Sequence, residues 1–201
     1  MLSLLFPVEQ ATLIDTWDTI GLRGTASDSY ELDNVFVPEA FTGTREHPDG
    51  SRELGSLYSF PQQAIYAVGV AGVALGIARA MLKAFSTLAT EKPPRGLARL
   101  MESPGVQAGV AKGEARIGAA RAYLLETLRE IAASAPHERA IGIEERARVR
   151  LATTNAIHGA IETADWLYKS AGGNAIFPGS PFERRFRDIH TLSQQIQSRD
   201  A

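Results

Sequence analysis

The sequence predicts a mainly α-helical protein: a C-terminal antiparallel four-helix bundle preceded by a few strands from the end of a β-domain. After residue 60, apolar residues recur at spacings of three and four, which is the helical period. Up to Pro38, β-branched and aromatic residues form short runs between Gly, Asp, Asn and Ser, as in strands and turns. Proline and glycine clusters divide the helical part into segments joined by short connections, which favours a bundle.

Composition narrows the class of protein. The 201 residues carry a formal net charge of −2 with both signs interspersed, so we expect no nucleic-acid partner and no anionic membrane surface. The chain has no cysteine, which excludes disulfides, thiolate-ligated zinc, iron–sulfur clusters and cysteine nucleophiles. The apolar N-terminus has no basic start and no small-residue cleavage site, unlike a signal peptide. We therefore expect a cytoplasmic protein.

Residues 1–41 are expected to be the end of a larger β-domain. The first residues and the alternating segment 29–37 resemble strands, but so few strands cannot close a sheet, and their edges need covering by other strands. The segment from Gly21 to Gly24 is interpreted as a tight turn between strands, because no helix follows it as in a phosphate-binding loop. Residues 42–58 are polar and contain Gly43, Pro48 and Gly50, so they are predicted to be a linker. The bundle is expected to occupy residues 59–201.

The first helix is predicted from near Pro61 to Thr90, where a Pro- and Gly-containing segment ends it. Its uncharged stretch is long enough to cross a membrane, but it is rich in Ala, Gly and Val, which favours a buried helix at the centre of a bundle. Three glycines share one side of this helix and are expected to let a neighbouring backbone approach: Gly69, Gly72 and Gly76.

Three further long helices follow. The second is predicted to begin with Ser103 as N-cap and Pro104 as its first residue. The third is expected over residues 144–171 and to stop at Gly172 and Gly173. The fourth is predicted to start with a capping box made by Ser180 and Glu183. Two apolar faces are expected: on the second helix Val106, Val110, Gly113, Ile117, Ala120, Leu124, Leu128 and Ile131, and on the fourth Phe182, Phe186, Ile189, Ser193 and Ile196.

Individual side chains give no reaction by themselves. The four histidines, at 47, 137, 158 and 190, have no carboxylate or second histidine at a ligand spacing, so no metal site is predicted. His158 lies on an apolar helix face and is interpreted as a hydrogen-bonded core residue. The arginines at 184, 185 and 187 are interpreted either as a phosphate site or as a salt-bridged surface, because Glu183 and Asp188 stand beside them.

Three stretches resemble the acyl-CoA dehydrogenase superfamily. Residues 20–25 and 32–39 (IGLRGT and LDNVFVPE) are similar to the end of its middle β-domain. Residues 168–176 and 180–190 (YKSAGGNAI and SPFERRFRDIH) resemble the closing helices of its flavin-dependent monooxygenase branch. Residues 92–96 and 104–107 (KPPRG and PGVQ) are also similar to that branch, so the resemblance covers nearly the whole chain.

The resemblance implies a flavin cofactor, FAD or FMN, bound between subunits of a dimer or tetramer. It places Gly172, Gly173 and Asn174 near the flavin of a partner subunit, and Arg95 and Gln107 near its phosphates and adenine end. Family members have an N-terminal helical domain and further β segments before the part matched here. The chain therefore resembles the C-terminal portion of such an enzyme, and alone is expected to be inactive.

The residues at the end of the last helix decide which reaction is carried over. One large branch abstracts a proton with a Glu placed shortly after the Arg-Asp pair, but here Gln194, Gln195 and Ile196 occupy that region. Asp188 lies earlier and is expected to pair with a neighbouring arginine. The monooxygenase branch often has a His where Gln195 stands, and Gln195 is the candidate catalytic residue because its amide can hydrogen-bond a flavin oxygen adduct.

These observations lead to one expectation with two alternatives. The chain is expected to belong to a flavin-dependent monooxygenase acting on a small apolar or aromatic substrate, with a flavin reductase as possible partner. The alternatives are an acyl-CoA dehydrogenase with a relocated base and a non-catalytic oligomerisation fragment.

Overall fold

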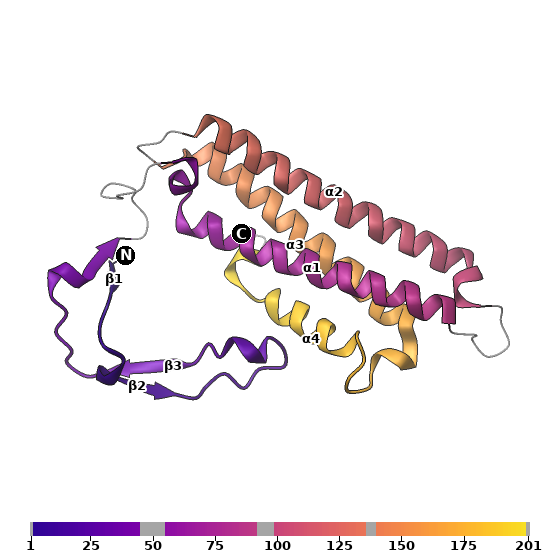
Figure 1. Cartoon of the computed structure of the whole chain (residues 1–201), viewed down its shortest axis with the longest axis horizontal. Helices are drawn as coiled ribbons and strands as arrows, with labels where there is room; N and C mark the ends of the chain where they lie inside the picture. The colour runs from indigo at the N-terminus through magenta and orange to yellow at the C-terminus, as the bar shows by residue number, and fades with distance from the viewer. Residues whose placement is uncertain (1, 45–54, 92–98, 136–139, 200–201) are drawn as a thin grey trace.

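The computed structural model describes residues 2–44, 55–91, 99–135 and 140–199. Helices α1 (Gln62–Glu91), α2 (Pro104–Ser134) and α3 (Ile143–Ala171) are long and consecutive ones run antiparallel, and α4 (Glu183–Leu192) packs against α1 and α3 (Figure 1). The predicted four-helix bundle is confirmed. The expectation that all four helices are long is wrong for α4, which has 10 residues. Arg95, His47 and His137 lie outside the described residues.

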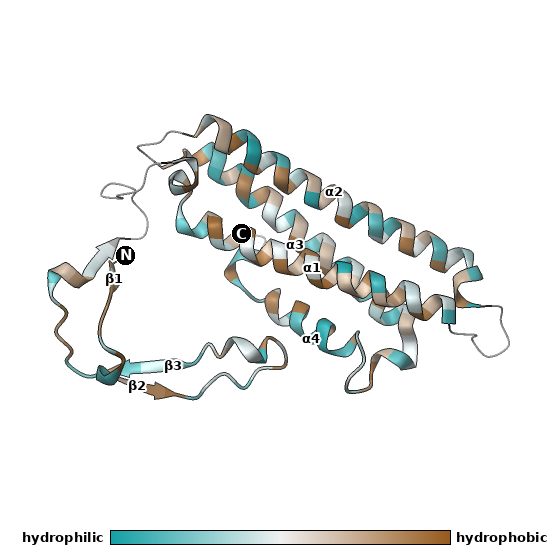
Figure 2. Ribbon diagram, viewed as in Figure 1, coloured by the Kyte–Doolittle hydropathy of each residue, from teal (hydrophilic) through white to brown (hydrophobic). Residues whose placement is uncertain are grey.

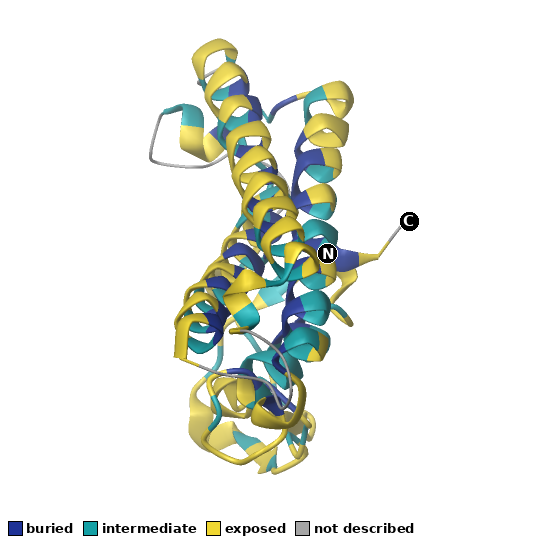
Figure 3. Ribbon diagram, turned by 90° about the vertical axis from the view of Figure 1, so that its right-hand side faces the viewer, coloured by how far each residue is buried: buried dark blue, intermediate teal, exposed yellow. Residues whose placement is uncertain are grey.

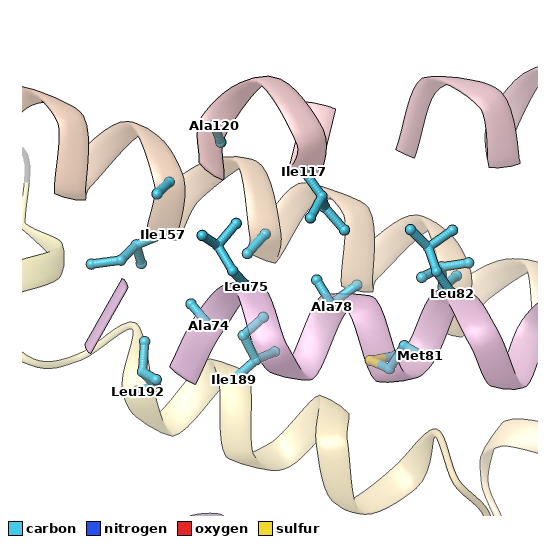
Figure 4. Packing of buried hydrophobic residues seen from close by; sticks show 14 of the residues in the cluster. Ala74, Leu75, Ala78, Met81, Leu82, Ile117, Ala120, Ile157, Ile189 and Leu192 are labelled. Carbon is cyan, nitrogen blue, oxygen red and sulfur yellow. The ribbon is translucent and has the colours of Figure 1, made fainter. Parts of the chain in front are cut away.

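The centre of the bundle is an interface between α1 and α3 that is rich in alanine. Ala71, Ala74 and Ala78 of α1 and two alanines of α3, Ala160 and Ala164, are fully buried in the same core cluster. Larger side chains fill the core around them, including Met81, Leu82, Ile117, Ile157 and Ile189 (Figure 4). Buried residues line the inner sides of the helices while their outer sides are exposed (Figure 3). Small side chains at such an interface let two helix axes approach closely.

Glycines on α2, and not those on α1, allow close packing. A Cβ at Gly109 would lie 1.8 Å from Cζ2 of Trp166 on α3, so the indole ring occupies the space that a side chain would need. The predicted apolar face of α2 is confirmed: five of its eight residues are buried and the other three are half-buried. The expectation for Gly69, Gly72 and Gly76 is wrong within this chain, since they lie on the exposed side of α1 with no described atom within 4 Å of their Cβ positions.

The N-terminal residues form two separate antiparallel pairs of strands. β1 (Leu2–Leu4) pairs with β4 (Thr42–Thr44), and β2 (Ala11–Ile14) pairs with β3 (Ser29–Leu32). β4 lies at the start of the segment expected as a linker. The described strands therefore do not close a sheet, as predicted, and Figure 2 shows β2 as a hydrophobic strand. Large apolar side chains of this segment are exposed: Leu13 of β2 by 69% and Phe36, which follows β3, by 85%.

Helix α1 has the length and hydropathy of a membrane-spanning segment. Among the helices of the described chain it is the one that meets both criteria, and 39% of its most apolar window is buried. Nine of its residues face the core, which is what a central bundle helix requires.

Candidate functional site

The N-terminal segment meets the bundle at Gly21. Among residues 2–43, Gly21 alone is buried, and a Cβ there would lie 2.2 Å from the carbonyl oxygen of Arg187 on α4. The next amide, the N–H of Leu22, donates to Oδ1 of Asp188 over 2.8 Å. The expectation that Asp188 pairs with a neighbouring arginine is met as a charge interaction with Arg187, whose pKa the carboxylate helps to raise. Its Oδ1 also accepts a main-chain hydrogen bond from a residue 166 positions earlier, which was not expected. Glycine is required here because the two backbones touch.

A turn shapes the docking segment. Leu22 has φ of +52° and is followed by a 3-10 turn at Arg23–Thr25, so the predicted turn at Gly21–Gly24 is confirmed. The indole Nε1–H of Trp17 donates to the carbonyl of Leu22 over 3.0 Å, which closes the segment on itself. Together with the bond to Asp188, this holds both the N–H and the C=O of Leu22.

Arg187 forms an ion pair with Glu183, one turn earlier on α4. The guanidinium also donates to the carbonyl of Ile20, so it bridges α4 to the N-terminal segment. The hydrogen bond from Arg187 lowers the pKa of Glu183 below its ordinary value, and the same bond raises the pKa of Arg187. The arginines at 184, 185 and 187 were interpreted either as a phosphate site or as a salt-bridged surface. The contacts of Arg187 are those of a salt-bridged surface.

A row of rings with a His–Asp pair lies where α4 crosses α3. Phe186 stacks on Tyr168 with ring centroids 4.1 Å apart, and the ring centroid of His190 lies 4.3 Å from that of Phe186. Nε2 of His190 is 2.8 Å from Oδ1 of Asp165. All four side chains are half-buried, so the row joins the two helices and also borders solvent.

The candidate catalytic residue, Gln195, stands on an exposed turn after α4. The helix ends at Leu192, and a short 3-10 turn (Ile196–Ser198) packs against α1 and α3. The prediction that Ile196 belongs to the apolar face of the last helix is wrong, because the helix has ended and the side chain is 64% exposed. The hydrogen bond expected of His158 is confirmed, since its Nε2 is 2.7 Å from the carbonyl of Ser198, but the residue is half-buried and not in the core.

The candidate cofactor residues Gly172, Gly173 and Asn174 form an exposed 3-10 turn after α3. Gly172 has φ of +59°, which suits glycine and ends the helix as predicted. No described atom lies within 4 Å of a Cβ at either glycine, so a flat ring or a phosphate can approach this backbone. The residues present therefore fit a cofactor that contacts the main chain.

The predicted capping box beside this turn is wrong. The Oγ of Ser180 accepts a 3.2 Å hydrogen bond from the N–H of Phe182 and donates to the carbonyl of Asn174 over 2.8 Å. Glu183 turns to Arg187 instead of reaching back to the cap. Ser180 thus ties the loop before α4 to the turn after α3.

Gln107 is exposed in the first turns of α2, and its Nε2 donates to the carbonyl of Met101 over 3.0 Å. Ser103 occupies the predicted N-cap position, although its side chain makes no capping hydrogen bond. A cleft of about 370 Å³ opens beside this end of α2, against α3. Its wall combines small residues with a ring and two cations: Gly105, Ala108, Gly109, Lys112, Gly113, Arg116, Thr163 and Trp166.

Two groups of candidate residues emerge. The beginning of α2, with Gln107, and the end of α3, with Gly172 to Asn174, lie at the same end of the bundle (Figure 1). Gln195 lies apart from them, beside the short turn that packs on α1 and α3. Within the described part of the chain, these candidate residues therefore do not form one compact site.

A family model for the acyl-CoA dehydrogenase C-terminal domain matches residues 68–199. The chain belongs to this family. Curated relatives include the indole-3-acetate monooxygenase of Pseudomonas putida, 31% identical over 94% of this chain and 49% of the relative. The indole-3-acetate monooxygenase of Acinetobacter baumannii is 27% identical over 98% of this chain and 50% of the relative. The chain spans about half the length of the curated relatives it matches.

Solved structures share the fold of this chain. XiaF from a Streptomyces species, in complex with FADH2 and glycerol, superimposes with a TM-score of 0.84 at 25% identity, covering 98% of this chain and 52% of XiaF. The 3-HSA hydroxylase from Rhodococcus sp. RHA1 has the same TM-score at 23% identity and the same coverage. The relatives are flavin-dependent monooxygenases with an acyl-CoA dehydrogenase-like fold.

Two contacts at the site have no signal in periodicity or composition. The backbone contact of Gly21 joins positions far apart in the chain, and only the conformational meaning of glycine hints at it. Arg150 of α3 donates to the carbonyls of Ile196 and Arg199. An arginine in a helical segment does not by itself indicate which residues it contacts.

Proposed function

We propose that this chain serves as the C-terminal part of the oxygenase component of a two-component, flavin-dependent monooxygenase acting on a small apolar or aromatic substrate. The observation that carries the proposal is similarity over nearly the whole chain to oxygenases of this kind, including the oxygenase component of a FADH(2)-dependent resorcinol hydroxylase from Rhizobium, 26% identical over 96% of this chain. A cytoplasmic location, a flavin reductase partner and a homo-oligomer, dimer or tetramer, are parts of the proposal.

The roles of Gly172, Gly173, Asn174, Gln107 and Gln195 are compatible with their positions, and the role of Arg95 rests on the family resemblance. The open backbone of Gly172, Gly173 and Asn174 would hold the cofactor, with Gln107 and Arg95 toward its phosphates. Bound reduced flavin would be the group that reacts with molecular oxygen. The protein would orient the substrate and exclude water. Gln195, which is exposed, would offer its side-chain amide as a hydrogen-bond donor to the reacting groups in the site.

The direct test uses the chain extended upstream of Met1 by the preceding in-frame genomic sequence. This protein is supplied with chemically reduced FAD or FMN, oxygen and a panel of aromatic compounds, and hydroxylated product and hydrogen peroxide are measured. We expect product with at least one compound, a lower product fraction for Gln195→Ala, and no change for the adjacent Gln194→Ala. Product yields in Gln195→Ala equal to those of the unchanged protein would remove Gln195 from the site.

The same extended protein tests the acyl-CoA dehydrogenase alternative. Proton abstraction next to a carbonyl needs a positioned base, and such groups contribute about a hundred- to ten-thousand-fold in rate. Gln194, Gln195 and Ile196 cannot accept that proton, and the carboxylate of Asp188 is engaged with the amide of Leu22. Anaerobic mixing with acyl-CoA thioesters should leave the oxidised flavin spectrum unchanged. Rapid bleaching would establish a relocated base.

The third alternative, an oligomerisation fragment, is tested with the 201-residue chain itself. Large apolar side chains remain exposed on α1 and in the N-terminal segment, including Tyr66, Val73 and Phe36, so sedimentation should show a dimer or larger. Titration with FMN and FAD should show weak binding or none. Submicromolar flavin binding by this chain would mean that it holds a complete cofactor site. Self-association with no flavin chemistry in the extended protein would favour the oligomerisation fragment.

A further inference from the structure

Two side chains of α3 hold the turn that follows Gln195 by donating hydrogen bonds to three of its main-chain carbonyls. An Nη2 group of Arg150 donates to the carbonyl of Ile196 over 3.0 Å and to that of Arg199 over 2.7 Å. Two helical turns further along α3, Nε2 of His158 lies 2.7 Å from the carbonyl of Ser198 and donates to it. Positions 150 and 158 share one face of α3, since they are two i, i+4 steps apart.

The turn also has hydrogen bonds of its own, among them one from the buried Oγ of Ser198 to the carbonyl of Leu192 over 3.2 Å. Within it, the amide of Gln195 donates to the carbonyl of Leu192 over 3.1 Å, and the amide of Ser198 donates to the carbonyl of Gln195 over 2.9 Å. The side chain of Gln197 is buried, but its Oε1 has no hydrogen-bond partner among the described residues. A buried polar atom without a partner is unfavourable, so burial of Gln197 alone holds the turn weakly.

We propose that Arg150 and His158 are positioning residues: by holding the carbonyls of residues 196, 198 and 199 they fix the turn and thereby the place where the Gln195 side chain enters the flavin site. The inference rests on the proposed function, because it takes Gln195 to be a site residue. The guanidinium can do this because its Nη2 carries two N–H donors, one for each carbonyl, and it stays protonated in proteins.

The proposal explains why a catalytic side chain can stand on an irregular segment. Gln195 follows the last residues of α4 and is itself exposed, so neither a helix nor a packed side chain fixes its direction. Catalytic groups must be held within a fraction of an ångström of the productive geometry. Here that restraint comes from hydrogen bonds to the backbone on the C-terminal side of Gln195, supplied by the rigid helix α3.

The first measurement is hydrogen exchange on the 201-residue chain. Arg150→Met keeps most of the aliphatic stem and removes both donated bonds, so the amides of Gln195 and Ser198 should exchange about tenfold faster or more. His158→Phe should act in the same direction. The matched control is Arg148→Met on the same helix, whose partner is the exposed Glu130 on α2, and it should leave these amides unchanged. Equal exchange in Arg150→Met and the unchanged chain would overturn the proposal.

The second measurement uses the upstream-extended protein and separates positioning from folding. We expect Arg150→Met to bind flavin within about twofold of the unchanged protein while its ratio of product to hydrogen peroxide falls several-fold, as for Gln195→Ala. Combining the two changes should lower the ratio little further, because both act on the same side chain. Faster exchange with an unchanged product ratio would reduce the arginine to a structural role and overturn the inference. If the unchanged extended protein binds no flavin and forms no product, the proposed function fails, whatever the exchange experiment shows.

Discussion

Replacing Gly21 with alanine should undock the N-terminal segment from α4 without unfolding the bundle. The new Cβ would lie 2.2 Å from the carbonyl oxygen and 2.4 Å from the carbonyl carbon of Arg187, which are main-chain atoms of a helix and cannot rotate away. To reach ordinary contact the segment must move outward by about 1 Å or more. That shift stretches the 2.8 Å hydrogen bond from Leu22 to Asp188 beyond the ~3.2 Å limit for a good N–H···O bond.

The expected size follows from the bond that is lost. A hydrogen bond to a charged group contributes about 1.5–3 kcal/mol, which corresponds to roughly ten- to 150-fold in a local opening equilibrium. The amide of Leu22 should therefore exchange at least about tenfold faster in Gly21→Ala. The midpoint of urea unfolding should change little, because Gly21 is the one buried residue among residues 2–43.

Gly24→Ala is the matched control, since no described atom lies within 4 Å of its Cβ position. It should leave the exchange of the Leu22 amide unchanged. Asp188→Ala should reproduce the effect of Gly21→Ala, and the double change should add little, because both break one contact. The reasoning is refuted if Gly21→Ala protects the Leu22 amide as well as the unchanged chain does.

Three further predictions concern the bundle. Gly109→Ala should destabilise it by about 1–3 kcal/mol in urea unfolding, because the Trp166 ring must shift. Gly69→Ala, at an exposed helix position with open space, should stabilise the isolated bundle by about 0.5–1 kcal/mol, and a loss of stability there would show that something covers this face. The pKa of Glu183 is lowered by Arg187, so their pairing stabilises the fold above the ordinary carboxyl pKa and is lost as pH falls through the lowered value. The difference in Tm between the unchanged chain and Glu183→Gln should be present at neutral pH and should shrink as the pH falls from the ordinary glutamate pKa of about 4.3 through the lowered value, and a difference that persists in stronger acid would contradict this cause.

The helices could be predicted because their signal is local. The apolar faces of α1, α2 and α3 repeat over about eight turns each, and Pro104 and Gly172 mark a start and an end that the structure confirms. The exposed face of α1 was misjudged because glycines at helical spacing show only that a backbone could come near. Whether a neighbouring backbone does pack against these glycines depends on partners elsewhere in the chain or on another molecule.

Contacts of the site are non-local, and for that reason the sequence indicated residues but not their partners. Asp188 was expected to pair along its own helix, but nothing in the sequence indicated that it also binds an amide 166 positions away. Ser180 and Glu183 have the spacing of a capping box, but each has a competing partner: the loop carbonyl of Asn174 and the guanidinium of Arg187. Gln195 was indicated by family resemblance alone, since an exposed amide on a turn has no distinguishing pattern.

The alanine-rich interface between α1 and α3 sets the distance between these two helices, and the contacts of α3 with the C-terminal turn and α4 depend on that distance. Alanine loses no rotamer freedom when it is buried, so this contact forms at little entropic cost, but it also contains no side chain that can rearrange to absorb a larger neighbour. Replacing Ala160 or Ala164 with valine would push α3 away from α1, together with Arg150, His158 and Asp165, which contact the C-terminal turn and α4. Adding one or two methyl groups at these distant positions would then shift the C-terminal turn by small steps. Such a series of variants would change the position of Gln195 without replacing any residue that contacts it.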